Sequence, residues 1–405
     1  MRQTLSILIA LSLLLCLSSC YTRQNTDVKD SEEEHVVLSE EPIAAEIVTY
    51  YCSIGNYTDA LLAQIQNWNE TEGAEKGVEI QVTTLCNCPL TLEDHLARGD
   101  RWDLFDGGND FDLCSKGWIT DLSSLSNQQI QSLLDSYRKI MLSGACIFDD
   151  ITVAVPKEAI PIKLTVNLDL FEKNGLELPK TWEEIITAAR IITENGDGTE
   201  YGWGASTWNR YFSTFILKGS MGSTEVGYWD PNTAVYQFSQ YETPINALAQ
   251  MYQNNSILGL DNMGLDEIRY QFSKGKVGML PAISIDYTVY TQQFPAQCNY
   301  TFIDMPAYDS STHHYSNVFY YRCGPSICAP AYNQSSEVHQ RAIEEAWLFL
   351  NSDQLNQSLY QNGCIIPCKQ ELMEQTKLLP EENDAQWTAI SNLENYTIET
   401  AENSV

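Results

Sequence analysis

Basic side chains are scarce in this chain of 405 residues. Lysine and arginine together number 23 against 54 aspartate and glutamate residues, so the formal net charge is −31. Nucleic-acid binding depends on a basic surface that neutralises phosphates, and this balance argues against a nucleic-acid partner. It argues more weakly against an anionic small ligand, which a local basic pocket could still bind. The excess of negative charge favours solubility through self-repulsion.

Catalytic and metal-binding motifs are also absent. The sequence has no Gly-x-Ser-x-Gly motif, no His-Glu-x-x-His motif and no Walker loop. The adjacent residues His313 and His314 would point to opposite faces of a strand, which weakens them as a chelating pair. A segment that resembles a calcium loop has Thr193 and Gly204 at its first and last ligand positions, where acids are needed. We therefore expect no metal, no cofactor and no catalytic residue.

A long apolar run occurs only at the N-terminus, and it is too short to span a membrane comfortably. It covers Leu5–Leu17 and leads into Leu-Ser-Ser-Cys, which resembles the lipobox of bacterial lipoproteins. We expect a signal peptide over 1–19 and a lipid on Cys20, which would anchor the protein to the outer face of the cell membrane, facing the extracellular or periplasmic side. An ordinary secretory signal is the alternative. Residues 20–45 are polar and acidic and predict a disordered tether.

Cysteine occurs twelve times, and its role in the folded body stays open. Cys16 would leave with the signal and Cys20 would carry the lipid. The other positions are Cys52, Cys86, Cys88, Cys114, Cys146, Cys298, Cys323, Cys328, Cys364 and Cys368. Their spacing matches no zinc signature, and their even number permits disulfides outside the cell. Free thiols that pack as small apolar residues are the alternative.

Strand and helix patterns alternate in the first part of the body. Strands are expected over 47–52, 78–85 and 102–105, with helices between them. This alternation is typical of a parallel or mixed sheet, in which ligands collect at the carboxyl ends of the strands. The rule directs attention to 52–57 and to 106–110, the second of which contains Asn109 and Asp110.

The central stretch 151–190 is the most informative part of the chain. A buried strand is expected over 151–155, ended by Pro156, and a second strand over 162–167 after the break at Pro161. Thr181-Trp182-Glu183-Glu184 then has the form of a capping box that begins a helix.

This stretch resembles the bacterial extracellular solute-binding proteins of ABC importers, the group that includes maltose-binding protein. The similarity rests on Val-Ala-Val-Pro at 153–156, Val-Asn-Leu-Asp-Leu-Phe at 166–171, and Pro-Lys-Thr-Trp-Glu-Glu at 179–184. Further matches are Gln-Phe-Ser-Lys-Gly-Lys-Val-Gly-Met at 271–279 and the segment 361–367. The resemblance covers about 46–375 and is weakest over 200–265.

The resemblance implies an α/β, two-lobed fold of the type II periplasmic-binding-protein kind, with mixed sheets flanked by helices and a ligand cleft between the lobes. Closure about a hinge would bury the ligand. The expected ranges are 46–158 plus 307–331 for lobe one, 162–303 plus 336–400 for lobe two, and crossovers near 158–163, 303–307 and 331–336.

Aromatic residues supply the candidate ligand contacts. The chain has 22 tyrosines and 9 tryptophans, and sugar sites combine flat aromatic faces with polar side chains around the edge. Position in loops, residue type and the resemblance together predict a site made of Asn109, Asp110, Trp208, Tyr211, Asp286, Tyr287 and Tyr320. The family often carries a tryptophan in the segment after Met279, where this chain has Tyr287 instead, and this departure weakens the sugar assignment.

The function that the resemblance implies is capture of a small solute, a sugar or oligosaccharide by preference, and its delivery to the transmembrane subunits of an ABC permease. We expect a monomer that is not an enzyme. A polyamine or a phosphorylated polyol stays open as the ligand. A sensory binding protein and a surface glycoside hydrolase are the alternatives from other functional classes.

Overall fold

The computed structural model describes residues 45–52, 58–84, 92–107, 111–141, 146–208, 211–220, 229–230, 235–236, 238–307, 317–374, 384–393 and 396–398. The predicted signal peptide, Cys20 and most of the tether lie outside them. Within the described part of the chain, no helix is both long and apolar enough to cross a membrane.

The first sheet, sheet one, has four strands in the order β14-β3-β1-β2. Strand β1 (Glu46–Cys52) pairs in parallel with β2 (Val78–Thr84) along its whole length and with β3 (Leu104–Phe105) on its other side. Strand β14 (Ser326–Ile327) closes the order antiparallel to β3. The predicted alternation of strands and helices therefore forms a mainly parallel sheet, in which the carboxyl ends of β1 and β3 lie at the same edge.

Helices cover sheet one and bury its apolar side chains. These helices are α2 (Thr58–Glu70), α3 (Glu72–Lys76), α4 (Leu92–Ala97), α5 (Phe111–Ser115), α6 (Gln128–Tyr137), α12 (Ala329–Gln334), α13 (Glu337–Leu350) and α14 (Asp353–Gln361). Helix α13 packs on β1 and β2, and its Ile343 and Trp347 are fully buried in the same core as Val48 and Tyr50. The chain therefore returns to the first sheet late in its sequence.

The second sheet, sheet two, has seven strands in the order β10-β7-β11-β6-β13-β15, with β12 also paired to β6. Its strands are β6 (Pro156–Asn167), β7 (Tyr201–Gly204), β10 (Ile257–Leu258), β11 (Val277–Ile283), β12 (Tyr300–Asp304), β13 (Asn317–Cys323) and β15 (Tyr396–Ile398). Strands β10, β7 and β11 run parallel, whereas β6 is antiparallel to β11, β12 and β13. Sheet two is therefore mixed, as predicted.

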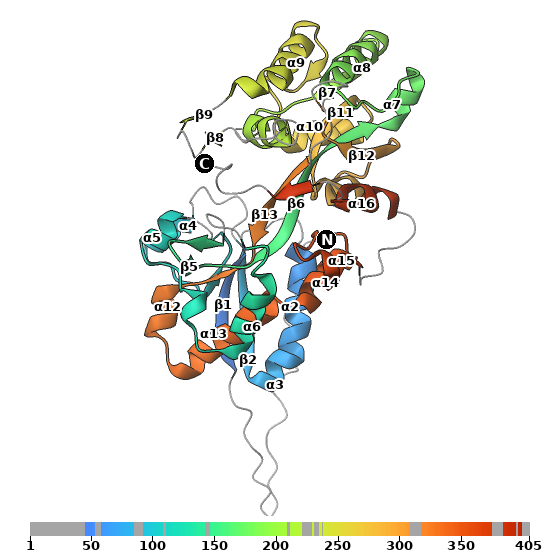
Figure 1. Cartoon of the computed structure of the whole chain (residues 1–405). Coiled ribbons are helices and arrows are strands. Elements are labelled where there is room, and N and C mark those ends of the chain that lie inside the picture. Colours follow the sequence, from blue (N-terminus) through green and yellow to red (C-terminus); the bar gives the residue numbers. More distant parts are fainter. Residues whose placement is uncertain are drawn as a thin grey trace, which may run out of the picture. The chain divides into compact units, whose positions relative to one another are not determined.

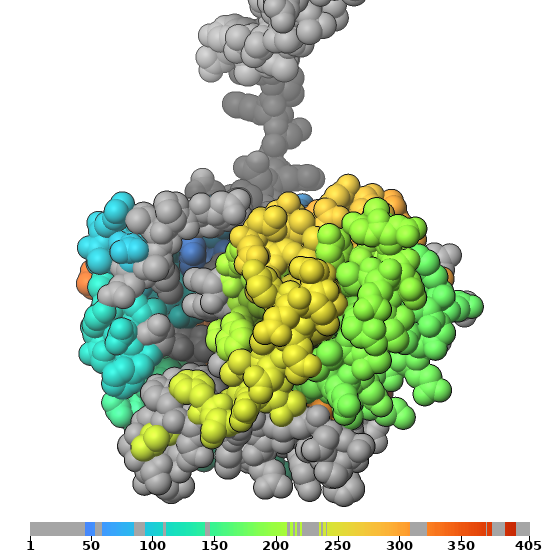
Figure 2. Space-filling view, turned by 90° about the horizontal axis from the view of Figure 1, so that it is seen from above, coloured from blue at the N-terminus to red at the C-terminus, as the bar shows by residue number. Residues whose placement is uncertain are grey.

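Helices also cover sheet two. They are α7 (Leu168–Lys173), α8 (Trp182–Asn195), α9 (Glu242–Gln253), α10 (Leu265–Ser273), α11 (Asp286–Thr288) and α16 (Asp384–Ser391). Figure 2 shows α8 in green and α9 in yellow on one face, where the two helices contact each other. The predicted capping box begins α8: Glu184 N donates to Thr181 Oγ1 at 3.2 Å, and Thr181 N donates to Glu184 Oε2 at 3.1 Å.

Strand β6 corrects one expectation from the sequence. The predicted strand over 151–155 shortens to β5 (Ile151–Thr152), which pairs with β4 (Ile147–Phe148), and β6 then runs unbroken through both prolines. Pro156 is the first residue of the strand, where proline is tolerated. Pro161 faces Phe319 of β13 at the point just before β11 begins to pair with β6. Figure 1 shows β6 in green beside β13 in orange.

Two segments lie with a different sheet from the one the sequence predicted. Helices α13 and α14 fall within the range expected for lobe two, 336–400, yet most of their buried apolar side chains lie in the core of sheet one, with Tyr360 of α14 in the core of sheet two. Strand β13 falls within 307–331, the range expected for lobe one, yet it pairs with β6 of sheet two. An amphipathic pattern identifies a buried face without showing which sheet covers it.

Candidate functional site

The carboxyl end of β3 carries the first predicted polar segment. Asp106 follows β3 and is buried, and its Oδ1 accepts a hydrogen bond of 2.7 Å from the hydroxyl of Tyr50 on β1. This bond fixes the start of the loop against the neighbouring strand. The predicted ligands Asn109 and Asp110 lie outside the described residues.

The carboxyl ends of β7 and β11 lie at the same edge of sheet two because the two strands are parallel. Residues 205–208 follow β7, and residues 284–287 follow β11. These segments contain three of the predicted site residues, Trp208, Asp286 and Tyr287, and Tyr211 begins the adjoining π-helix Tyr211–Lys218. The structure therefore brings these predicted residues to one edge of sheet two.

Trp208 is half-buried at this edge. Its ring packs against Phe215 with centroids 5.9 Å apart, and its backbone N–H donates to Ser206 Oγ at 3.1 Å. The contact with Phe215 supports one part of the indole, and the remainder reaches the surface. A supported, partly exposed indole is the kind of surface on which a sugar ring stacks.

Tyr211 is buried and its hydroxyl is occupied. The hydroxyl donates to Gly204 O at 2.9 Å and accepts from Trp203 Nε1 at 3.1 Å. Burial raises the pKa of this phenol well above its usual value. These contacts tie the π-helix to β7, so Tyr211 acts in this structure as a support beneath Trp208.

Asp286 is buried with a cationic partner. Its Oδ1 accepts from Arg269 Nε at 2.8 Å, and its Oδ2 accepts from Ile283 N at 2.8 Å. Burial on its own would lower the pKa of Arg269, but the Asp286 carboxylate outweighs burial and raises it. Both carboxylate oxygens of Asp286 therefore accept hydrogen bonds from within the protein. The next residue, Tyr287, is also buried, with its ring 5.0 Å from that of Trp387.

Tyr320 lies on β13, where its backbone pairs with Ile160 of β6. Its side chain is outside the described part. Among the predicted residues whose side chains the structure describes, Trp208 is the one with a surface available to a ligand, and Tyr211, Asp286 and Tyr287 have internal contacts.

A buried charged pair at the start of β6 was not among the predicted residues. Lys157 Nζ donates to Leu350 O, at the end of α13, at 3.0 Å. Glu158 Oε2 lies 2.8 Å from Arg322 Nη1 of β13, and its Oε1 accepts from Ser284 Oγ, after β11, at 3.2 Å. Consecutive strand residues point to opposite faces, so Lys157 contacts a helix of sheet one and Glu158 contacts strand ends of sheet two.

Burial dominates the protonation of both members of this pair. It lowers the pKa of Lys157, which Asp106 and Cys52 partly restore, and it raises the pKa of Glu158, which Arg322 partly offsets. The sequence did hold a signal, since Lys157 and Glu158 are two charges inside the apolar run Val-Ala-Val-Pro-Lys-Glu-Ala-Ile. These residues link β6 of sheet two to helix α13, which packs on sheet one.

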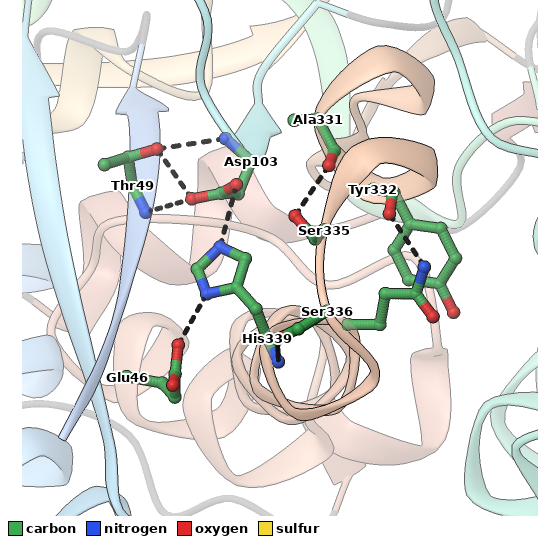
Figure 3. A network of polar contacts seen from close by, with 9 residues as sticks. Glu46, Thr49, Asp103, Ala331, Tyr332, Ser335, Ser336 and His339 are labelled. Carbon is green, nitrogen blue, oxygen red and sulfur yellow. Dashed lines mark hydrogen bonds and ion pairs between the residues drawn. The ribbon is translucent and has the colours of Figure 1, made fainter.

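A second polar network lies at the start of β1, away from the carboxyl end of that strand (Figure 3). His339 of α13 is placed between two carboxylates, with Nδ1 2.9 Å from Glu46 Oε2 and Nε2 3.2 Å from Asp103 Oδ1. Asp103 Oδ2 in turn accepts from Thr49 N at 2.8 Å and from Thr49 Oγ1 at 2.7 Å. Burial on its own would lower the pKa of His339, but the two carboxylates raise it overall. Because Glu46 begins β1, the network fastens the start of the sheet to α13.

No group of three or more potential metal ligands occurs among the residues that the structure describes. Two mixed sheets, each flanked by helices, define an α/β protein.

The chain matches the family model of bacterial extracellular solute-binding proteins over residues 96–300, half of its length. It belongs to that family, as the resemblance in its sequence implied. The family and the structural neighbours consist of binding proteins, not enzymes. A search of curated protein sequences finds no match.

Solved structures show the same fold at low sequence identity. The GacH receptor of Streptomyces glaucescens, described with acarbose, has a TM-score of 0.69 at 16% identity over 89% of each chain. The maltodextrin-binding domain MalE of Bdellovibrio bacteriovorus, bound to maltotriose, has a TM-score of 0.66 at 14% identity over 88% of this chain and 89% of that one. A solute-binding protein of Thermotoga lettingae, bound to α-D-tagatose, has a TM-score of 0.65 at 18% identity over 89% of this chain and 90% of that one. The likeness confirms the predicted type II periplasmic-binding-protein fold.

Proposed function

We propose that this protein is the solute-binding component of an ABC importer and that it captures a sugar or oligosaccharide. Family membership supports solute binding, and the sugars bound by GacH, MalE and the Thermotoga protein support the class of ligand. The observation that carries the site assignment is Trp208, a half-buried indole supported by Phe215 at the carboxyl end of β7. Its flat face offers stacking area, and the polar loops nearby would bind hydroxyls.

Capture would proceed by closure of two lobes over the ligand. The strand β6 is the natural hinge element, because Lys157 binds the end of α13 while Glu158 binds Arg322 and Ser284 in sheet two. A ligand that contacts both lobes would favour the closed form by its difference in affinity for the two forms. Asn109, Asp110 and Tyr320 would join Trp208 in the cleft, with Tyr211, Asp286 and Tyr287 holding the wall in place.

Delivery would then occur at the membrane. In this proposal Cys20 carries the lipid anchor, the acidic tether spaces the body from the membrane, and the closed monomer docks on the permease subunits. A sensory role is compatible with the same fold, in which case the closed form would bind a receptor instead of a permease. The net charge of −31 makes a cationic ligand, such as a polyamine, the second candidate.

A thermal-shift screen of the full chain tests the ligand class. The panel contains mono- and oligosaccharides, polyamines and phosphorylated polyols. A ligand at a hundred times its dissociation constant adds about 2.7 kcal/mol to the free energy of unfolding, which raises the unfolding midpoint. A rise with a sugar that is recovered unchanged supports the proposal. A rise only with a polyamine or a phosphate ester would overturn the sugar assignment.

Two variants then test the site. Trp208→Ala should weaken sugar binding by about 1–3 kcal/mol, comparable to losing the burial of a large apolar side chain. Tyr252→Ala is the matched control, because Tyr252 is an exposed aromatic on α9 and is 52% exposed. Isothermal titration should show unchanged affinity for the control. Equal affinity of the two variants would remove Trp208 from the site.

A further inference from the structure

Three buried cysteines from distant parts of the sequence meet where β13 ends. The sulfur atoms of Cys146 and Cys323 lie 3.6 Å apart, and both side chains are buried. Cys368 is also buried and lies close enough to both for their charges to interact. The two contacting cysteines are 177 residues apart, so local sequence has no part in bringing them together.

Backbone pairing holds the two contacting cysteines in place. The carbonyl of Cys146 accepts a hydrogen bond of 2.9 Å from Val153 N. Cys323 is the last residue of β13 and pairs with Pro156, and the next residue, Gly324, donates to Val155 O at 2.8 Å. The remaining freedom lies mainly in the side-chain torsions. A disulfide needs the sulfurs to approach to about 2.05 Å, a movement of about 1.5 Å from the present contact.

We propose that Cys146 and Cys323 form a disulfide when the protein folds outside the cytoplasm. Membership of an extracellular family places the chain where disulfides persist. The bond would tie the hairpin β4–β5 to the end of β13, and hence to the start of β6, in the core that also contains Phe148 and Val153. Cys368 would remain a thiol.

The oxidant is a low-molecular-weight disulfide, and the step is thiol–disulfide exchange. The thiolate of one cysteine attacks the oxidant, forms a mixed disulfide and releases one small thiolate. The second cysteine then attacks the protein sulfur of the mixed disulfide and releases the other small thiolate. Two protein thiols lose two electrons and two protons, and one small disulfide becomes two small thiols.

The burial of both thiols also bears on when this oxidation takes place. The hydrogen bond shared with Cys146, and then burial, raise the pKa of the Cys323 thiol well above its usual value. The attacking species is the thiolate, so exchange in the folded protein is slow. The pair is therefore oxidised while the chain folds, before the core containing Phe148 closes over it.

The test compares two oxidation conditions on the full chain. Reduced protein is exposed to oxidised and reduced glutathione either in the folded state or during refolding from denaturant. Free thiols are then alkylated under denaturing conditions, and linked peptides are identified by mass spectrometry. Refolding should link Cys146 to Cys323 in most molecules and raise the unfolding midpoint by about 3–5 °C over the reduced protein. Oxidation of protein that is already folded should form this disulfide at least tenfold more slowly than oxidation during refolding.

Variants separate the bond from simple packing. Cys146→Ala should abolish the midpoint difference between oxidised and reduced protein. Cys328→Ala is the matched control, since Cys328 is a buried cysteine of the same core, and it should retain the difference. The proposal is overturned if both cysteines are fully alkylated after refolding, or if Cys323 is linked instead to Cys368. The peptide analysis uses the natural chain, so it decides the question even if a variant fails to fold.

Discussion

Asp286 offers the sharpest test of the distinction between a ligand-binding residue and a structural one. The sequence predicted it as a ligand contact, and the structure pairs it with Arg269 inside the protein. The Asp286 side chain is 1% exposed and that of Arg269 is 7% exposed. Substitution of Asp286 by Asn keeps the size of the side chain and removes its charge, so it isolates the electrostatic contribution.

The expected cost follows from the surroundings of Arg269. Without the Asp286 charge, the buried guanidinium is left, in the part of the chain that the structure describes, with Asp266 at 3.3 Å, whose side chain is 65% exposed and solvated. Breaking a buried pair by removing one partner costs about 3–5 kcal/mol, because it leaves an uncompensated buried charge. The asparagine amide also cannot accept from both Arg269 Nε and Ile283 N with two oxygens. We expect Asp286→Asn to lower the free energy of unfolding by about 3–5 kcal/mol.

Calorimetric unfolding of the full chain provides the measurement. For a folded body of about 360 residues, this loss corresponds to a midpoint lower by about 4–7 °C. Asp266→Asn is the matched control. This substitution removes a solvent-exposed charge beside the same arginine, and it should lower the free energy of unfolding by less than about 1 kcal/mol. If the two variants are equally stable, the structural reading of Asp286 is wrong. A large loss of ligand affinity with an unchanged midpoint would instead support the prediction from sequence.

Two further predictions concern stability. The pKa of His339 is raised in the folded protein. Its two ion pairs therefore stabilise the fold fully at pH values below the pKa of the unfolded state, about 6.5. This stabilisation disappears as the pH rises through the higher pKa of the folded state. The stability difference between the natural chain and His339→Gln, followed by urea denaturation, should therefore shrink with rising pH, and a constant difference would contradict this assignment. Gly202→Ala places a methyl group 2.1 Å from the Cα of Ala189, and should destabilise the packing of β7 on α8 by about 3 kcal/mol or prevent folding. Gly264→Ala, which has open space around it, is its control and should keep the midpoint within about 1 °C.

Local patterns carried a large part of the fold. The capping box before α8 was readable because its hydrogen bonds join residues only three apart. Helix α13 has the same local character, since Ile343 and Trp347 are four residues apart and lie on one buried face. The family resemblance rested on such short segments and was confirmed.

Long-range pairing explains what the sequence alone did not predict. Two prolines indicated a broken strand at 156–161, but β6 is continuous because β13 and β11 arrive from far along the chain to pair with it. Position after a strand predicted Asp286 as a ligand contact, and the residue does follow β11. It could not reveal that Arg269, on the preceding helix, would turn inward and occupy the carboxylate.

The sequence by itself determined the class of fold and the family, because helix caps, strand periodicity and family motifs are properties of neighbouring residues. Only the tertiary structure decided which of the candidate side chains after β7 and β11 remain partly exposed. Trp208 is half-buried, whereas Tyr211 and Tyr287 are buried, and Tyr287 packs against Trp387 from far along the chain. The tertiary structure also brought Cys146 into contact with Cys323. Exposure and side-chain contact depend on what covers a residue in three dimensions, and the covering segments are distant in the chain.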